Sequence, residues 1–160
     1  MGIQGASQHS FTFDADTRLQ DATAVTATAA GEIATVAQEL DFGAVDSNGV
    51  TNIAFMEGHM IIDVSAFDFT TGDEFVQVIF QLGSVSGFAS GTVANKAVIP
   101  IGVAGGLVNS AADNDSALGR RVIHVDNEFL GTPLRFARAF LVAGGTSPSI
   151  TAEVWLSRIR

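Results

Sequence analysis

Three histidines and several carboxylates are the side chains of this 160-residue chain that could bind a metal ion or transfer protons. His9, His59 and His124 are far apart, and no pair has the HxH or HExxH spacing of a metal site. The chain has no cysteine, which excludes disulfides and thiolate chemistry. We therefore expect structural or solvated histidines, with no metal and no cofactor.

Catalytic patterns are incomplete in the same way. His124 and Asp126 would share one face of a strand, as an imidazole and a carboxylate do in a catalytic triad. The GxSxG turn that would present a nucleophilic serine is missing, and the Gly-Ser-Val-Ser-Gly segment at 83–87 does not match it. Residues 113–116 begin like a calcium loop, but Ala117 and Leu118 occupy positions that need oxygen ligands or glycine. The sequence predicts a protein that is not an enzyme.

Composition points to partners other than nucleic acid. The formal net charge is −9, which argues against a protein that binds a phosphate backbone. Seven of the eight basic residues are arginine, a side chain suited to paired contacts with carboxylates on proteins. Residues 1–80 hold 12 acidic side chains and one basic, whereas residues 81–160 hold 5 and 7. This asymmetry would allow the chain to stack on copies of itself or on a charged shell.

Targeting signals are absent from the sequence. Residues 1–10 have neither a basic nor an apolar region of the kind that begins a secretory signal. The charge-free stretch at 75–95 has the length of a membrane span but contains glutamines, serines and glycines. We expect a soluble chain that is made in a cytoplasm and does not enter a membrane.

Short runs rich in Val, Ile, Phe and Thr alternate with glycine clusters, which is typical of an all-β domain. The strongest run, 58–67, has Met60, Ile62, Val64 and Ala66 on one face by its period of two. A turn at 70–73 would join it in a hairpin to the alternating run at 75–82.

The last third of the chain repeats this pattern. We expect Leu134, Phe136, Phe140 and Val142 to be buried on one face of a strand that Arg138 interrupts. After a turn at 144–149, alternation at 150–156 predicts the final strand. Further strands are expected near 33–42 and 93–103, and the Ala- and Thr-rich segment 22–37 is expected to be extended.

These elements predict an all-β fold: a single-domain antiparallel β-sandwich or jelly roll with an extended N-terminal arm. The arm would comprise residues 1–20 and the sandwich residues 21–160. Phe11 and Phe13 would be exposed apolar anchors on the arm, unless they pack on their own domain.

The order of several short motifs is also informative. Phe13-Asp14-Ala15-Asp16 leads to an Asp-Ala-Thr-Ala-Val-Thr-Ala segment from Asp21, and Leu40-Asp41-Phe42-Gly43 ends a strand. A strand containing 134–140 then precedes Gly-Gly-Thr-Ser-Pro-Ser at 144–149 and a final strand, as in a C-terminal hairpin. In this order the chain resembles the jelly-roll capsid cement, or head decoration, proteins of tailed bacteriophages of the Bordetella-phage type.

The resemblance implies a structural virion protein, made in the cytoplasm of the host bacterium. Such a protein binds the exterior of an icosahedral capsid, where it cements neighbouring major capsid subunits. Its partners would be the major capsid protein and itself, as a homodimer or homotrimer. Among residues that are apolar or basic in polar surroundings, the candidate capsid or oligomer contacts are Phe11, Phe13, Arg18, Arg120 and Arg121.

One alternative also fits an all-β chain without catalytic motifs. The protein could be a phage fibre or tail module, or a β-sandwich that binds carbohydrate. Carbohydrate-binding sandwiches usually present aromatic faces, and Trp155 is the single tryptophan in a chain without tyrosine.

Overall fold

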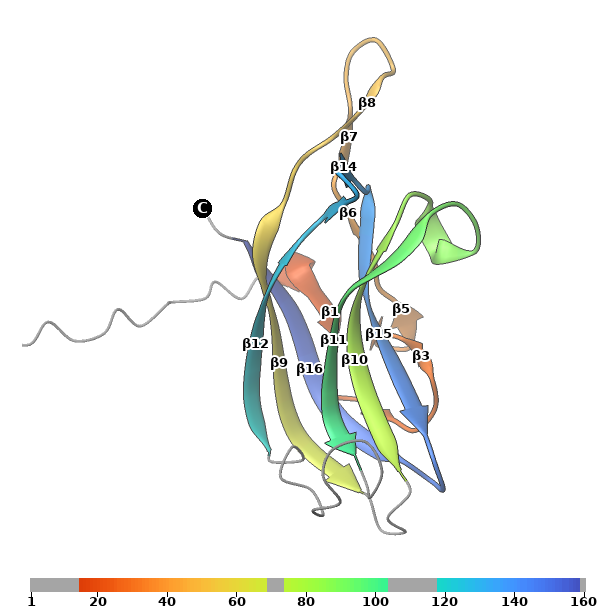
Figure 1. Cartoon of the computed structure of the whole chain (residues 1–160), viewed down its shortest axis with the longest axis vertical. Coiled ribbons are helices and arrows are strands. Elements are labelled where there is room, and N and C mark those ends of the chain that lie inside the picture. Colours follow the sequence, from red (N-terminus) through yellow and green to blue (C-terminus); the bar gives the residue numbers. More distant parts are fainter. Residues whose placement is uncertain (1–14, 69–73, 104–117, 159–160) are drawn as a thin grey trace, which may run out of the picture.

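Two antiparallel β-sheets pack face to face in the computed structural model of the chain (Figure 1). The structure describes residues 15–68, 74–103 and 118–158. Apart from two short 3₁₀ turns, Ala15–Thr17 (η1) and Ser86–Phe88 (η2), the regular elements in these ranges are all strands. None of the described elements is a helix of the length and apolarity that a membrane crossing requires. The predicted all-β antiparallel sandwich is confirmed.

Sheet I has the strand order β1-β16-β9-β12, and β2 also pairs with β16. Its central strands, β9 and β16, are its longest and pair with each other, while β9 also pairs with β12 and the other edge of β16 with the short strands β1 and β2. The strands of sheet I are β1 (Arg18–Gln20), β2 (Ala24–Val25), β9 (Glu57–Asp68), β12 (Gly119–Asp126) and β16 (Ser149–Arg158).

Sheet II has the order β11-β10-β15-β3, and β6 also pairs with β15. The predicted strand at 93–103 is confirmed as β11. The strands of sheet II are β3 (Ala29–Ala30), β6 (Leu40–Asp41), β10 (Phe75–Gly83), β11 (Val93–Val103) and β15 (Phe136–Gly144).

Three small hairpins complete the described chain. They are formed by β4 (Glu32–Ile33) with β5 (Val36–Ala37), β7 (Gly43–Val45) with β8 (Thr51–Ile53), and β13 (Glu128–Phe129) with β14 (Thr132–Pro133). The expected strand at 33–42 is therefore broken into parts of β4, β5 and β6. In Figure 1 the β7–β8 hairpin projects from one end of the sandwich.

The core lies between the sheets and follows the period of two in each strand. The predicted inward faces of β9, β10 and β16 are confirmed with one exception, because their alternate side chains are fully or almost fully buried. These side chains are Met60, Ile62, Val64, Val76, Val78, Phe80, Leu82, Ile150, Ala152, Val154 and Leu156. The exception is Ala66, which is exposed: the register with β16 shifts between Val64 and Ala66, and Phe67 packs against the core instead.

The predicted hairpin between 58–67 and 75–82 is wrong. β9 belongs to sheet I and β10 to sheet II, so the chain crosses between the sheets where a turn was expected. The C-terminal hairpin is wrong for the same reason, because β15 lies in sheet II and β16 in sheet I. Local alternation defines a strand's faces but does not say which strand will pair with it.

The predicted inward face of β15 is also wrong, apart from Leu134, which precedes the strand and does join the core. Ala137, Ala139 and Leu141 point into the sandwich, so the opposite parity of the strand faces outward. Phe136 and Phe140 on that outer face are covered by other side chains. The Arg135 guanidinium lies 4.9 Å from the Phe136 ring centre, and that of Arg138 lies 4.8 Å from the Phe140 ring centre.

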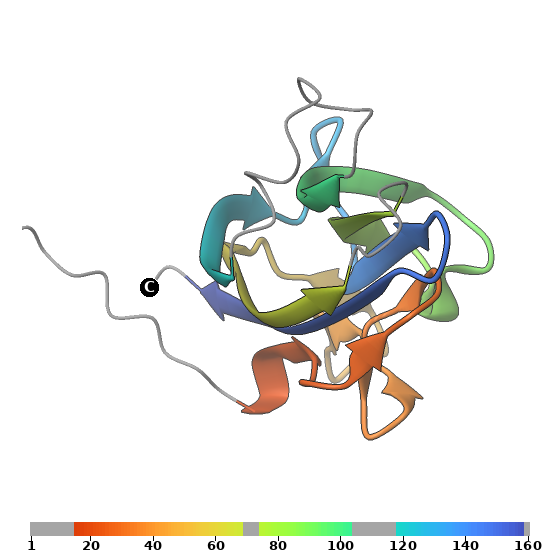
Figure 2. The same cartoon turned by 90° about the horizontal axis from the view of Figure 1, so that it is seen from below.

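One side of the sandwich is closed by the segment between β1 and β6, seen in red and orange in Figure 2. This closing segment pairs first with β16 of sheet I, through β2, and then with β15 of sheet II, through β3 and β6. Its start, β1, pairs with β16, and Leu19 lies in the core. Sheet I therefore begins at Arg18, before the boundary expected at residue 20, and residues 1–14 of the predicted arm lie outside the described residues.

Candidate functional site

The outward face of sheet I gathers most of the polar side chains that the sequence singled out. Strand register aligns Arg18 with Trp155, Trp155 with Ile61 and Ile61 with Val122, so four strands contribute one row. Ile61 is fully buried although it faces outward, because the side chains beside it cover it. From Arg18 at its end, the row continues as an apolar strip of Trp155, Ile61 and Val122, with charged residues on one flank and histidines on the other.

Arg18 at the end of the row and Arg120 on the charged flank are each bound to a carboxylate of the neighbouring strand. Arg18 donates to Glu153 and lies 5.5 Å from the Trp155 ring centre. Arg120 donates to both oxygens of Asp63, at 2.7 and 2.6 Å, and this pairing raises the pKa of its guanidinium. Two of the predicted contact residues are therefore held in defined positions within their own chain.

Arg121 is not brought to the same face as Arg18 and Arg120. It lies next to Arg120 on β12, but alternation turns it to the opposite face, in register with Ile62 of the core. Phe11 and Phe13 lie outside the described residues.

His124 does not pair with Asp126, as a catalytic arrangement would have required. Its Nε2 lies 2.8 Å from Glu57 Oε1, and its ring meets that of His59 edge-on with centres 5.6 Å apart. Asp126 instead forms an ion pair with Lys96 of β11, in which Lys96 Nζ lies 2.7 Å from Asp126 Oδ1. The parts of the chain that the structure describes contain no group of three or more His, Asp or Glu side chains arranged to hold a metal ion.

A second candidate surface lies at the end of the sandwich from which the β7–β8 hairpin projects. Every residue from 44 to 55 is exposed, including the large apolar side chains of Val45, Val50, Ile53 and Phe55. Val45 is 64% exposed, and Leu130 at the tip of the β13–β14 hairpin is 88% exposed. We call the β7–β8 hairpin together with Phe55 and Leu130 the hairpin end.

The tip of the β7–β8 hairpin is a defined turn. Asp46 Oδ1 accepts hydrogen bonds from the N–H groups of Val50 and Asn48, both at 2.9 Å. These bonds lower the pKa of the Asp46 carboxyl. Gly49 has a φ of 79°, which glycine adopts without strain.

Asn127 fixes the base of both hairpins and is fully buried. Its side-chain amide donates to the carbonyl oxygens of Ala54 and Leu134, at 2.9 and 3.1 Å, and its Oδ1 accepts from the Met56 N–H at 2.8 Å. Its own backbone bonds to Met56 and Leu134 as well. Sequence reasoning missed this residue, because an asparagine between two acidic residues looks like part of an exposed turn.

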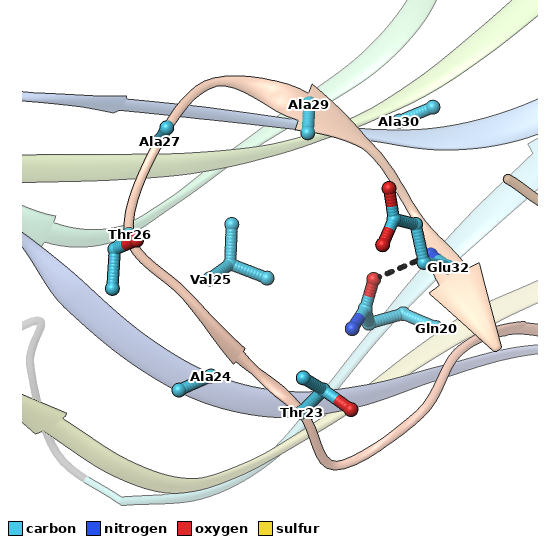
Figure 3. Close-up of a pocket in the computed structure, with 9 residues that line it drawn as sticks. All are labelled: Gln20, Thr23, Ala24, Val25, Thr26, Ala27, Ala29, Ala30 and Glu32. Carbon is cyan, nitrogen blue, oxygen red and sulfur yellow. Dashed lines mark hydrogen bonds between the residues drawn. The ribbon is translucent and has the colours of Figure 1, made fainter. Parts of the chain in front are cut away.

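A cavity of roughly 190 Å³ lies inside the ring that residues 20–32 form in the closing segment. Figure 3 shows Val25 pointing into this ring, while Gln20 accepts a hydrogen bond from the Glu32 N–H at 2.7 Å. Alanine and threonine side chains make up most of the wall, and no basic or aromatic side chain lines it. The cavity therefore lacks groups that would orient an anion or stack on a ring.

Comparisons with known proteins assign the chain to no family: no family model, curated protein or solved structure matches it. What the outward face of sheet I and the hairpin end could bind therefore follows from their geometry.

Proposed function

We propose that this protein is a structural virion protein. It binds the outside of an icosahedral phage capsid and cements neighbouring major capsid subunits, as the motif order of its sequence implies. In this proposal the sandwich has the jelly-roll type of the cement proteins that it resembles. The virion exterior is its site of action, and the major capsid protein is its main partner.

The hairpin end is the observation that carries the proposal. Its apolar side chains project from the body on a turn fixed at the tip by Asp46 and at the base by Asn127. Exposed apolar groups held on a rigid support are typical of a surface that binds another protein, because little conformational entropy is lost on docking. On a symmetric shell, weak contacts of this kind would be repeated many times and would add up.

Val45 and Ile53 share one face of the hairpin, which makes it open to a direct test. The double variant Val45→Thr/Ile53→Thr keeps β-branched side chains but removes methyl groups from the docking face. We expect it to bind at least about tenfold more weakly to capsids of the encoding phage that have been stripped of this protein. Co-sedimentation would measure binding, and heat release of DNA from the heads would measure cementing.

The matched control is Val36→Thr on β5, where the valine is 61% exposed but lies outside the hairpin end. This variant should bind like the unchanged protein. Failure of the unchanged protein to bind stripped capsids would overturn the proposed function. Equal binding by the double variant would instead remove the hairpin from the docking surface.

Carbohydrate binding, by a fibre, tail or other β-sandwich module, is the second candidate. Trp155 favours it, since its half-buried ring lies on the outward face of sheet I close to the carboxylates of Glu153 and Asp63. The aromatic ring could stack on a sugar, and the neighbouring carboxylates could accept hydrogen bonds from the sugar hydroxyls. A glycan-array signal that Trp155→Ala abolishes would support this candidate, and an array without signal would count against it.

A further inference from the structure

Most of the cationic side chains in the described chain are neutralised by a carboxylate of the same chain. These ion pairs are Arg18–Glu153, Lys96–Asp126, Arg120–Asp63 and Arg135–Asp41. Arg138 on β15 differs from them, because no carboxylate in residues 15–68, 74–103 and 118–158 forms an ion pair with its guanidinium. Its positive charge is therefore available to a carboxylate from outside the described chain.

The guanidinium of Arg138 is held in place by its neighbours. Its Nε donates to Gln81 Oε1 at 2.8 Å, and Gln81 Nε2 in turn donates to Asn95 Oδ1 at 3.0 Å. The guanidinium also lies 4.1 Å from the ring centre of Phe88 and 4.8 Å from that of Phe140. Because its position is already fixed, the side chain has little conformational freedom to lose when a ligand binds.

The two Nη groups of Arg138 are its unused hydrogen-bond donors. A guanidinium has five N–H groups, of which Gln81 accepts the one on Nε. Neither Nη atom of Arg138 is buried without a partner, so both reach the surface of the described chain. Two parallel N–H groups on this edge match the two oxygens of one carboxylate.

Apolar side chains lie on both sides of Arg138 on the outward face of sheet II. Strand register places its row, with Gln81 and Asn95, between two others. These two rows are Val98, Ile79 and Phe140 on one side, and Val93, Gly83 and Phe136 on the other. Val93 is 41% exposed and Val98 is 47% exposed. An arginine set among apolar and aromatic side chains is typical of the residues that dominate protein–protein interfaces.

The surroundings of Arg138 also strengthen its attraction for an anion. Burial lowers the pKa of its guanidinium, whereas the charge of Glu39 raises it. Glu39 accepts hydrogen bonds from Ser86 Oγ and from the Gly87 N–H, so its carboxylate is held at η2 and forms no ion pair with Arg138. A half-buried cation is poorly hydrated, and its attraction for an opposite charge is greater than in bulk water.

We propose that the Nη edge of Arg138 binds a carboxylate side chain of another protein, an aspartate or glutamate with apolar neighbours. Charge complementarity selects an anion, and the apolar rows on both sides select a peptide segment over a free ion. A phosphate backbone would require clustered cations, whereas the neighbouring Arg135 is already paired with Asp41 and the chain has a net charge of −9. The site does not include the hairpin end, so it does not rest on the proposed function.

Two blocked tripeptides that differ by one charge test this site. Acetyl-Val-Asp-Val-amide has a carboxylate between two apolar side chains, and acetyl-Val-Asn-Val-amide has a neutral amide of the same shape. In NMR titrations of the unchanged protein without a capsid, we expect the aspartate peptide to bind at least about fivefold more tightly. It should also shift the signals of the Arg138 Nε–H and of the Gln81 side-chain amide, which locates the peptide without any variant.

Arg138→Gln should abolish the preference for the aspartate peptide, because a neutral amide replaces the guanidinium. The matched control is the double variant Arg135→Gln/Asp41→Asn, which removes the guanidinium stacked on Phe136 together with its own carboxylate and should keep the preference. Thermal unfolding would verify that both variants fold. Equal affinity of the unchanged protein for the two peptides, loss of the preference in the control, or tighter binding of inorganic phosphate than of the aspartate peptide would each overturn the proposal.

Discussion

Asn127 joins the β13–β14 hairpin to the chain between β8 and β9 with three side-chain hydrogen bonds. Replacing it with alanine would leave two carbonyl oxygens and one N–H without their partners. We expect Asn127→Ala to lower the free energy of unfolding by about 2–4 kcal/mol, because buried polar groups without partners are costly. Urea denaturation would measure this loss.

Asn95→Ala is the control for that variant, since Asn95 is exposed and accepts one hydrogen bond from Gln81 at 3.0 Å. Asn95→Ala should lower the free energy of unfolding by less than about 1 kcal/mol. Equal losses for the two variants would mean that Asn127 does not hold the hairpin base together.

Asp21 makes stability depend on pH. Hydrogen bonds from the Thr23 side chain and from the Ala34 N–H lower the pKa of its carboxyl. Since the folded pKa lies below the unfolded one, this stabilisation is complete above about pH 4 and is lost as the pH falls through the folded pKa. The melting temperature of Asp21→Asn at pH 6 should therefore be below that of the unchanged protein, and the difference between the two should become smaller as the pH falls. Melting temperatures between pH 6 and 2.5 would test this, and a gap that stays constant would contradict it.

The sequence predicted Arg18 and Arg120 as contacts to other subunits and did not indicate the partners of its arginines within the chain. Arg18, Arg120 and Arg135 each bind a carboxylate far away in sequence, because strand pairing brings those residues together. Such pairs depend on which strands become neighbours, and spacing along the chain carries no information about that. His124 likewise contacts Glu57 of the neighbouring strand, a partner that its position in the sequence did not indicate.

At the level of elements, the closing segment depends on a close approach at Gly31. A Cβ atom there would lie 2.2 Å from the Leu19 carbonyl oxygen, and the Gly31 N–H donates to the Ala139 carbonyl at 2.9 Å. Because backbone atoms would have to move, we expect Gly31→Ala to cost more than about 2 kcal/mol in unfolding free energy.

Gly131→Ala separates this steric effect from backbone conformation. Gly131 has a φ of 79° but open space around its Cβ position, so alanine there should cost only about 1–2 kcal/mol. Denaturation of both variants would compare the costs. A smaller loss of unfolding free energy for Gly31→Ala than for Gly131→Ala would show that the closing segment can move to accommodate the added methyl group.

Strand positions could largely be predicted, whereas their arrangement could not. Period-two alternation located β9, β10 and β16, because burial on one face imposes that pattern. For β15 the larger side chains were expected inside, but small Ala137 and Ala139 fill the core. Phe88 from η2 and Arg138 cover the outer aromatic side chains, with the Arg138 guanidinium 4.1 Å from the Phe88 ring centre. Pattern alone does not distinguish a core face from an outer face that another segment covers.

At the scale of the whole molecule, the placement of β16 has a consequence for how the protein is made. This strand follows all the others in the described chain, yet it lies between β1 and β9 in the middle of sheet I. Until the ribosome has synthesised β16 and released it from the exit tunnel, β1 has no partner strand and one edge of β9 remains open. Folding of sheet I must therefore follow synthesis of nearly all of the described chain, and pairing over such long separations is slow. The nascent chain would depend on chaperones during that interval.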